Sequence, residues 1–536
     1  MTVKNRVKRA KPLVSVLLPT YNRRNFLPTA LSSVVQQNYN NIEIFVIRDG
    51  GEDVSDIINS FEDRRIVFID RQENRGKAFS LNQAFSHVRG KYIAYLDDDD
   101  LYYPHHIETL VSALEDNSDY QVAYSDLYRT YCRLGPDGSR EVLSKVLDIS
   151  RDFDRFLMLC FNHTLHVSLM HTRKILERTG TFNEQLNILI DWDLTRKLVF
   201  FTDFLHVHEI TGEFFHLIGD SDRISVQYRK DKDRYVKNFL RIRTTRPPKP
   251  WSKIKDMSII LTVDKPNEQL RDTVLDIWQH TFYPYQIYLP LPQSDINRLD
   301  IGIPNTITVP VNSHLSKDQV IDEAVSKCDG DFVAIVPAGF PIRNFWVEDS
   351  IYSLINSSVN KEAFELEDST DSRWAVILSK NDLDYARKNF PHASLRQSLK
   401  AAGITIRRVL PEEIPFQFDQ LLEQARCAEK EGNWLKAAQK FAYIAEHHQN
   451  ELWMKTLAAE AFYKAGLNAQ AAELVRRVNQ QRPTVDTLLL EAKLNREKNG
   501  SKSAIPLLEK AEQMLEFPVC SIRQEPQNEV ALKENN

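Results

Sequence analysis

The sequence lacks most features that mark secreted, membrane-spanning or nucleic-acid-binding proteins. The formal net charge of -5 on 536 residues gives no sign of a nucleic-acid partner. The most apolar stretches, such as residues 198–205, are broken by charge far short of the ~20 residues of a membrane helix. The five cysteines have no paired spacing, which argues against a zinc site or a disulfide framework: Cys132, Cys160, Cys328, Cys427 and Cys520. We therefore expect a cytoplasmic protein without a transmembrane segment.

The first eleven residues, MTVKNRVKRAK, are basic but are not followed by the long apolar core of a signal peptide. We interpret residues 1–11 as a basic tail in solvent. Contact of this tail with an anionic membrane surface is the alternative, and it would make the protein peripheral at a membrane. The whole chain is too long for one hydrophobic core, so several domains are expected.

What the sequence does contain is an acidic cluster directly after an apolar run. Residues 90–104 read GKYIAYLDDDDLYYP, in which residues 93–96 are predicted to form a buried strand that ends at four aspartates, Asp97, Asp98, Asp99 and Asp100. Adjacent carboxylates repel one another, so a fold tolerates them best where a cation or several donors lie among them. Open α/β sheets bind ligands at this edge. A solvated acidic turn is the alternative.

Apolar patterns of strand and helix alternate before this cluster. The strands are predicted at residues 14–18, 42–47 and 66–70, and the helices at 26–37 and 76–88. This alternation predicts a mainly parallel sheet with helices on both faces. Because each strand of such a sheet ends at the same edge, Tyr21, Asp49 and Asp97 are expected to converge on one pocket.

Three segments resemble, in letters, order and spacing, the nucleotide-sugar-binding half of the family 2, GT-A fold glycosyltransferases. They are VSVLLPTYNRRNFLPTALSSVVQQNYNNIEIFVIRDGG, ENRGKAFSLNQAF and GKYIAYLDDDDLYYP, and the resemblance extends over about residues 12 to 225. It implies an α/β fold of the GT-A (nucleotide-diphospho-sugar transferase, Rossmann-like) type. We assign residues 12–240 to this catalytic domain.

The resemblance also implies a donor site with a metal ion. The Asp-x-Asp pair of the family falls on Asp97 and Asp99, which would hold Mg²⁺ or Mn²⁺ against the diphosphate of a nucleotide-sugar. A hard divalent ion prefers oxygen ligands and neutralises charge on the departing nucleoside diphosphate. Leu81 stands where the family commonly has arginine, so Arg75 or Lys77 would meet the phosphates instead. The donor-binding residues implied are Thr20, Tyr21, Asn22, Asp49, Lys77, Asn82, Asp97 and Asp98.

A second acidic motif implies the catalytic base. Residues 180–184, GTFNE, and 190–194, IDWDL, resemble the family's Gly-x-Phe-Asp-Glu stretch and the acidic pair that begins the next helix. The resemblance implies that Asp191 is the general base, which accepts a proton from the acceptor hydroxyl in a single inverting displacement. A helix N-cap is the alternative for Asp191. For Asp193 we expect a helix N-terminal charge or an ion pair with Arg196.

Two further observations bear on this resemblance. His216 lies where some relatives place another metal or phosphate ligand, although a lone histidine between apolar residues is more often part of the core. The chain has no Gln-x-x-Arg-Trp motif downstream and no predicted membrane helix. Both absences argue against a processive polysaccharide synthase.

The sequence predicts that the first domain is followed by a degenerate copy of itself. Residues 241–254 are a Pro-rich linker by composition. Beyond it, the sequence aligns with the first domain and pairs Ser15 with Ser258, Ile44 with Ile287 and Gly90 with Gly330. This predicts a second GT-A-like α/β domain at 255–411. Residues 337–340, Pro-Ala-Gly-Phe, replace the four aspartates, so we expect no catalysis there, and an ordinary α/β domain is the alternative.

The last part of the chain has a helical pattern with a regular period. Gly432, Gly466 and Gly500 are spaced by 34 residues, which resembles tetratricopeptide repeats and predicts all-α helical repeats over 412–516. Such repeats usually bind a peptide or another protein. A plain helical bundle with a chance period is the alternative. Residues 517–536 are rich in Glu, Gln and Asn and are expected to be a disordered tail.

The predicted activity is metal-assisted, inverting transfer of a sugar from a nucleotide-sugar, with UDP-sugars implied by family usage. The acceptor hydroxyl would belong to a glycan, a lipid-linked molecule or a protein. The competing interpretation is a non-catalytic scaffold that binds sugar nucleotides or glycans.

Overall fold

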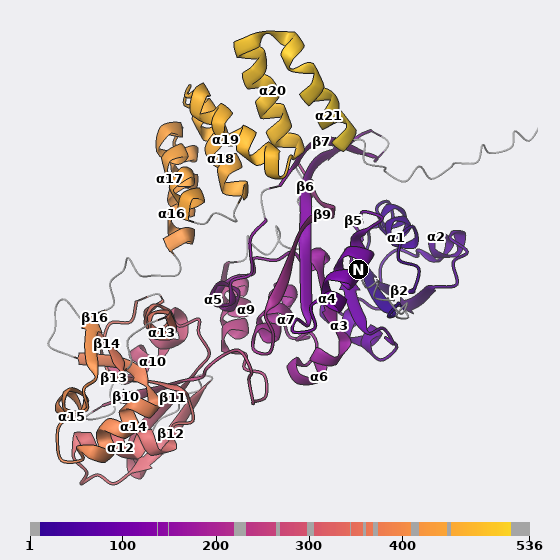
Figure 1. Cartoon of the computed structure of the whole chain (residues 1–536). Helices are drawn as coiled ribbons and strands as arrows, with labels where there is room; N and C mark the ends of the chain where they lie inside the picture. The colour runs from indigo at the N-terminus through magenta and orange to yellow at the C-terminus, as the bar shows by residue number, and fades with distance from the viewer. Residues whose placement is uncertain are drawn as a thin grey trace, which may run out of the picture.

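The computed structural model describes residues 11–136, 138–147, 150–218, 232–263, 268–296, 305–343, 345–356, 361–367, 374–408, 417–447 and 452–515. Two α/β parts and one helical part follow one another along the chain (Figure 1). The predicted C-terminal tail and all of the predicted N-terminal tail except Lys11 lie outside the described residues. No helix in the described part of the chain is long and apolar enough to cross a membrane.

The first sheet has the strand order β3-β2-β1-β4-β8-β6-β9-β5, with β7 paired to β6. Strands β1 to β4 are parallel, and β8 is antiparallel to both of its neighbours. The strand bounds are β1 (Val14–Thr20), β2 (Ile42–Asp49), β3 (Ile66–Arg71), β4 (Tyr92–Tyr95), β5 (Leu101–Tyr102), β6 (Val122–Leu134), β7 (Arg140–Val146), β8 (Leu169–Thr172) and β9 (Phe204–Leu217).

Helices cover both faces of this sheet, as the alternating pattern predicts. Successive residues of β2 face opposite sides, so Ile44 packs in one apolar core with α1 and α4, and Phe45 packs in another with α3 and α7. The helix bounds are α1 (Leu27–Val35), α2 (Ser55–Ser60), α3 (Lys77–Phe85), α4 (His106–Asp116), α5 (Arg155–Cys160), α6 (Leu176–Thr179), α7 (Ile190–Val199) and α9 (Lys232–Thr244). The central β-strands are therefore buried on both sides, and the candidate site residues lie at their ends.

The second sheet has the order β12-β11-β10-β13-β15-β14-β16. It consists of β10 (Met257–Thr262), β11 (Tyr285–Pro292), β12 (Thr306–Val311), β13 (Phe332–Pro337), β14 (Glu362–Glu367), β15 (Trp374–Ser379) and β16 (Thr405–Arg408). Its helices are α10 (Glu268–His280), α11 (Gln293–Ile296), α12 (Lys317–Lys327), α13 (Trp346–Asn356), α14 (Lys380–Asn389) and α15 (Leu395–Ala401).

The second sheet repeats the order, the strand directions and the register of the first. Val16 pairs with Ala94 in the first sheet, and Ile259 pairs with Ala334 in the second. A local contact is repeated too: the Gly90 N–H donates to Ser15 Oγ at 3.0 Å, and the Gly330 N–H donates to Ser258 Oγ at 3.0 Å. Residues that the sequence alignment equates thus occupy equivalent positions in the two sheets. The predicted second GT-A-like fold is therefore confirmed.

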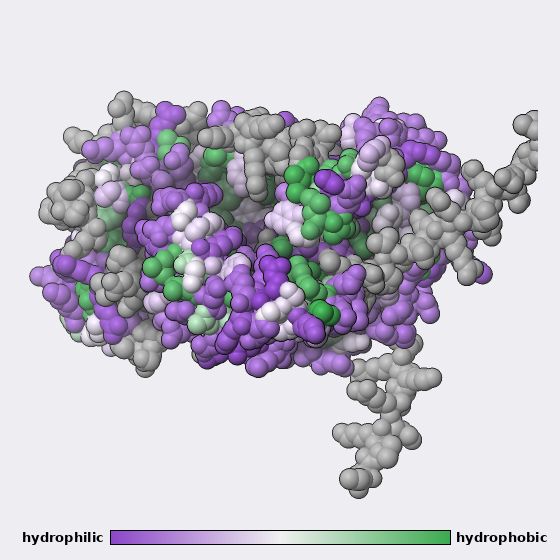
Figure 2. Space-filling view, turned by 90° about the horizontal axis from the view of Figure 1, so that it is seen from above, coloured by the Kyte–Doolittle hydropathy of each residue, from purple (hydrophilic) through white to green (hydrophobic). Residues whose placement is uncertain are grey.

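The C-terminal part consists of helices that pack in sequence. They are α16 (Gln417–Lys430), α17 (Trp434–His447), α18 (Leu452–Lys464), α19 (Asn468–Gln481), α20 (Val485–Asn499) and α21 (Ile505–Leu515). Gly432, Gly466 and Gly500 each lie in a turn between two helices with φ of +74°, +79° and +83°. Glycine adopts this left-handed conformation at no steric cost, which explains why a glycine recurs at each of these turns. Figure 2 shows this end of the molecule as a mainly hydrophilic surface with separate apolar patches.

The segment between the two α/β parts is more structured than its composition predicts. α9 continues through residues 241–244, so only the residues after Thr244 form the connection. The buried side chain of Arg196 on α7 fixes this region, because its guanidinium donates to the carbonyls of Thr245 at 2.7 Å and Arg243 at 2.8 Å. The same side chain donates to the Phe282 carbonyl at 3.2 Å. The two α/β parts therefore share a packed interface.

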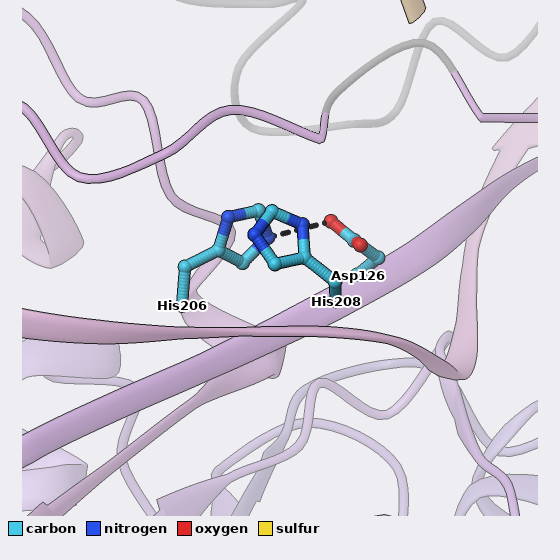
Figure 3. A group of neighbouring side chains, drawn as sticks. All are labelled: Asp126, His206 and His208. Carbon is cyan, nitrogen blue, oxygen red and sulfur yellow. Dashed lines mark hydrogen bonds and ion pairs between the residues drawn. The ribbon is translucent and has the colours of Figure 1, made fainter. Parts of the chain in front are cut away.

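The long strands β6 and β9 extend from the first domain toward the helical part (Figure 1). Asp126 on β6 lies beside His206 and His208 on β9 (Figure 3). His206 Nε2 is 3.0 Å from Asp126 Oδ1, and His206 Nδ1 is 2.8 Å from Asp152 Oδ1. Arg482, which follows α19, pairs with Asp126 and donates to Ser150 Oγ at 3.0 Å. Ion pairs therefore connect the helical part to the first sheet.

Candidate donor and catalytic site

Three parallel strands end together at one edge of the first sheet. β1 lies between β2 and β4, and its last residue is Thr20, while Asp49 ends β2 and Asp97 follows β4 by two residues. The predicted convergence of these strand ends is therefore observed. Tyr21 is largely exposed at this edge, and Asn22 has a left-handed backbone with φ of +52°.

Asp49 organises the loop that precedes α3. Its two oxygens accept from the backbone N–H groups of Arg75 at 3.0 Å and Gly76 at 2.8 Å, and Arg71 Nη1 is 3.2 Å away. These bonds fix the start of α3, whose first residue is Lys77. Asp49, which is predicted to bind the donor, thus also holds the backbone before α3 in place, and its donor-binding role stays a prediction.

Lys77 and Asp97 form an ion pair at the centre of the site. Burial alone would lower the pKa of Lys77, but the charge and hydrogen bond of Asp97, together with Asp191 and Asp99, raise it. Lys77 is therefore charged, and three carboxylates act on it. A cation at this position favours bound phosphate as well as the carboxylates.

Within the acidic cluster, Asp98 and Asp100 have surroundings unlike those of Asp97. Burial raises the pKa of Asp98 to about 8, with Asp99 and Asp97 adding to the rise and the Thr20 hydroxyl opposing it. Asp100 is almost completely buried, and its Oδ1 accepts from the Phe215 backbone N–H at 3.0 Å, which ties the cluster to β9. The cluster is thus a built part of the fold and not a solvated turn.

The acidic residues present a set of oxygens that fits a divalent metal ion. Asp97, Asp99 and Asp100 each offer one carboxylate oxygen, and these atoms lie within 4.8 Å of one another. Such hard oxygen ligands match Mg²⁺ or Mn²⁺. Sequence reasoning named Asp97 and Asp99 and did not include Asp100.

His216 lies on β9 and is not one of the residues grouped with these aspartates. Its ring packs edge-on against Tyr131, with the ring centroids 5.1 Å apart. The predicted metal role of His216 stays a prediction, and the observed contact is the one expected of a packed histidine.

Asp191 lies in the first turn of α7. The N-cap position belongs to Leu189, which has a left-handed φ of +60°, so the alternative that Asp191 caps the helix is wrong. Asn162 Nδ2 donates to Asp191 Oδ2 at 2.9 Å. Burial raises the pKa of Asp191 and Lys77 lowers it, while the charge of Asp97 adds a further rise. The charges of the predicted base and of Asp97 therefore both act on Lys77.

Two neighbouring predictions need correction or qualification. Asp193 lies in the first turn of α7, as one of the two expectations for it had it, but its ion pair is with Lys197 at 2.7 Å and not with Arg196, because Arg196 is turned toward backbone carbonyls. The Asn82 amide is bound to the segment that leads to α7: its Nδ2 donates to the Phe182 carbonyl and its Oδ1 accepts from the Phe182 N–H. This bond has a structural role, and donor binding by Asn82 stays a prediction.

Two residues near the site were missed by sequence reasoning. Asn162 holds Asp191, and His166 is a buried ring on which the charges of Lys77 and Asp97 act. Both belong to residues 160–168, whose sequence CFNHTLHVS has no helical or strand period. The asparagine and the two histidines in this short, otherwise mostly apolar stretch could have indicated a functional site.

The first domain is similar in sequence to known glycosyltransferases. Residues 15–167 match the sequence model of Glycosyl transferase family 2. An uncharacterized glycosyltransferase of Rickettsia prowazekii is 31% identical over 208 residues, which are 37% of this chain and 62% of that protein. One from Methanocaldococcus jannaschii is 30% identical over 190 residues, 34% of this chain and 63% of that protein.

Among solved structures, that of S. aureus TarS 1-349 in complex with UDP-GlcNAc matches with a TM-score of 0.34 and 16% identity, over 43% of this chain and 66% of that one. The chain spans about three fifths of the length of the curated relatives named above, 62% and 63%. Residues 15–167 are thus similar in sequence to Glycosyl transferase family 2, the family that the motifs resemble.

Proposed function

We propose that this protein is an inverting glycosyltransferase that moves a sugar from a nucleotide-sugar to an acceptor hydroxyl. The observation that carries the proposal is that Asp191 and Asp97 both act on Lys77, although 94 residues separate the two aspartates in the sequence. One edge of the sheet thus combines a candidate base, a cation and a candidate metal-binding carboxylate. These are the groups that sugar transfer from a diphosphate requires.

The strand-end residues would hold the donor. Asp97 and Asp99, with Asp100 beside them, would hold Mg²⁺ or Mn²⁺, which when bound acts as a Lewis acid on the leaving diphosphate. Lys77 adds a protein cation at the same place. The residues after β1, Thr20, Tyr21 and Asn22, together with Asp49, would line the nucleotide. We infer UDP-sugars as donors from family usage.

Asp191 would act as the general base. Asn162 donates to its Oδ2 and fixes the carboxylate, so Oδ1 is the oxygen that would accept the proton of the acceptor hydroxyl. The hydroxyl oxygen then bonds to the anomeric carbon from the side opposite the diphosphate, whose bond to that carbon breaks with its electron pair. Burial raises the pKa of Asp191, which makes it a stronger base than a solvated aspartate.

The remaining parts of the chain would support this reaction without catalysing it. At the strand ends of the second domain, Pro292 stands in place of Asp49 and Pro337 in place of Asp97. The described residues of this edge thus lack the carboxylates of the first domain. We infer that the second domain is a non-catalytic copy, and that the helical part, as tetratricopeptide-like repeats, binds a peptide or protein. The acceptor would be a glycan, a lipid-linked molecule or a protein.

The activity is tested by Mn²⁺- and Mg²⁺-dependent release of nucleoside diphosphate across a panel of UDP- and GDP-sugars. Asp191→Asn is expected to lower turnover at least a hundredfold while donor binding changes little, because a general base contributes about 10²–10⁴-fold. Asp99→Ala is expected to weaken metal-dependent donor binding. Asp119→Asn on the exposed surface is the matched control and is expected to behave as wild type.

Two outcomes would contradict this assignment. Normal transfer by Asp191→Asn would show that another group is the base. Absence of turnover with every donor, combined with measurable sugar-nucleotide binding by calorimetry, would support the scaffold alternative for the first domain.

A further inference from the structure

An exposed aromatic ring lies close to the candidate base. Phe161 directly follows α5, and its side chain is 38% exposed, whereas the rings that it contacts are buried or half-buried. The next residue, Asn162, donates to Asp191 Oδ2 at 2.9 Å. Because adjacent Cα atoms are about 3.8 Å apart, the Cα atom of Phe161 lies within about 11 Å of that carboxylate oxygen. Phe161 therefore presents apolar surface to solvent near the proposed site of proton transfer.

Phe161 belongs to an aromatic cluster that joins three parts of the chain. Its ring centroid lies 6.4 Å from that of Phe239 on α9. In the second α/β part it lies 5.9 Å from Phe282 and 6.3 Å from Phe345. Phe239 in turn meets the ring of Trp192 on α7 at 4.8 Å. The aromatic cluster thus extends from the helix that carries the candidate base to the second α/β part.

Two large apolar residues in this region have a left-handed backbone. Leu189 is the N-cap residue of α7 with φ of +60°, and Phe345 directly precedes α13 with φ of +62°. Large side chains avoid this conformation for steric reasons, and such strain collects at binding and catalytic sites. The ring of Phe345 stacks on that of Phe282 with a centroid separation of 4.6 Å. The second α/β part thus holds a strained aromatic residue against the cluster next to α7.

The exposed ring of Phe161 defines the chemistry of the ligand. The face of an aromatic ring carries partial negative charge, and the C–H groups on one side of a sugar ring pack flat on it while the sugar hydroxyls stay in water. A lipid chain would need a long apolar groove to leave water. Phe282 and Trp192 are buried, and Phe239 and Phe345 are only partly exposed, so the cluster offers no such groove. A sugar fits this surface better than a lipid chain does.

We propose that Phe161 stacks on a sugar of the acceptor, so that the acceptor is a glycan. The inference rests on the proposed function, in which Asp191 receives the proton of the acceptor hydroxyl. The donor residues lie at the strand ends, whereas the aromatic cluster comes from the segment after α5, from α9 and from the second α/β part. The acceptor glycan lies along this junction. The second α/β part, which lacks catalytic carboxylates, contributes to acceptor binding through Phe345.

The experiment compares Phe161→Leu with Phe156→Leu in the full-length protein. Phe156 on α5 is the matched control, because its ring also contacts the second α/β part, 5.7 Å from Tyr283 and 5.6 Å from Tyr352. Saturation-transfer NMR with irradiation of the aromatic protons measures binding of the tetrasaccharides of the cello-, malto-, manno- and chito-series. We expect the wild type to bind at least one of them.

The variants separate the aromatic face from simple packing. Leucine keeps apolar volume but has no ring face, so we expect Phe161→Leu to weaken binding of that tetrasaccharide about tenfold. Phe161→Tyr keeps the face and is expected to stay within about twofold of the wild type, as is Phe156→Leu. In transfer assays with the bound tetrasaccharide, Phe161→Leu is expected to raise the acceptor KM about tenfold and to change kcat little.

Four outcomes would overturn the proposal. Equal loss of glycan affinity in Phe161→Leu and Phe156→Leu would assign the effect to packing between the two α/β parts. Unchanged glycan affinity in Phe161→Leu would place the glycan elsewhere. Binding of none of the tetrasaccharides by the wild type, or transfer only to a lipid-linked or peptide acceptor, would show that the acceptor is not a glycan.

The two hypotheses fail separately in this experiment. Glycan binding that depends on Phe161, without turnover of any sugar nucleotide, would remove the transferase and keep the glycan site. Turnover with a lipid-linked or peptide acceptor, equal in the wild type and in Phe161→Leu, would do the reverse.

Discussion

At the scale of single residues, adjacent aspartates of one sequence run acquire different properties. Asp97 is paired with Lys77, Asp98 is buried beside other carboxylates, and Asp100 accepts a backbone N–H from β9. An extended backbone sends alternate side chains to opposite sides, so neighbours in sequence meet different surroundings. The four carboxylates of the cluster are therefore not interchangeable.

Asp98 predicts a pH effect on stability in the absence of divalent metal. Its pKa is raised to about 8 in the folded protein, so the folded state binds a proton that the unfolded state has already released above pH ~4. Stability is therefore expected to fall as the pH rises from ~4 toward 8. Asp98→Asn removes this loss and is expected to be more stable than the wild type at pH 8 by ~2–5 kcal/mol.

Urea unfolding in EDTA at several values between pH 5 and pH 9 measures this effect. The difference between Asp98→Asn and the wild type is expected to grow with pH. A constant difference over the whole range would show that Asp98 is ionised in the folded protein. Asp119→Asn, at an exposed position, is the matched control.

At the scale of elements, helix α7 links the candidate base to the second α/β part. Asp191 lies in its first turn, and Arg196, one turn and a half further on, is completely buried. Burial lowers the pKa of Arg196 to about 10, which still leaves it charged at neutral pH. Its hydrogen bonds run to the carbonyls of Leu159, Arg243, Thr245 and Phe282. The second part thus contributes to the placement of α7.

Arg196→Met tests this coupling. Methionine keeps much of the apolar stem but leaves four carbonyls without their donor, so we expect a loss of ~3–5 kcal/mol in unfolding free energy. We also expect turnover to fall more than donor affinity, because the acidic cluster is carried by β4 and not by α7. Denaturant unfolding and steady-state kinetics measure the two effects. Arg477→Met on the exposed side of α19 is the control, and an equal response of both variants would contradict the coupling.

At the scale of the whole molecule, a buried ion-pair cluster joins the helical part to the first sheet. Arg482 pairs with Asp126, and Asp126 in turn meets His206 (Figure 3). Burial alone would lower the pKa of His206, but its bonds to Asp126 and Asp152 raise it overall. Burial and the neighbouring His206 lower the pKa of His208, so that ring adds no compensating charge. The contact between the two parts therefore includes a histidine whose pKa is raised by its carboxylate partners.

This cluster predicts weaker attachment of the helical part at alkaline pH. Because the folded pKa of His206 exceeds the unfolded value of ~6.5, its contribution is complete below that value and is lost as the pH rises through the folded pKa. Hydrogen exchange of α19 and α20 is expected to accelerate with pH beyond the intrinsic chemical rate. His206→Gln is expected to abolish the extra pH dependence, and Arg482→Gln to accelerate exchange at all pH values. Equal corrected exchange at pH 6 and pH 9 in the wild type would contradict the prediction.

Much of the fold was predictable because short-range patterns determine it. The two periods of the apolar residues placed the strands and helices, and the alignment of Ser258 with Ser15 and of Gly330 with Gly90 predicted a second sheet whose register is indeed the same. The boundary of the linker was wrong, because residues 241–244 are helical: Arg243 and Thr244 belong to a helix held by the distant Arg196. Composition does not report such a contact.

The candidate site was likewise predictable only in part. The sequence by itself determined that carboxylates end the strands and that an acidic turn begins α7, because each of these is a local pattern in the chain. Only the tertiary structure decided which side chains meet: Lys77 with Asp97, Asn162 with Asp191, and Asp193 with Lys197 in place of Arg196. It also decided that His171 is satisfied and His166 is not. The physical reason is that a hydrogen bond or an ion pair depends on separation in space, and residues far apart in sequence reach that separation only when the sheet brings their strands together.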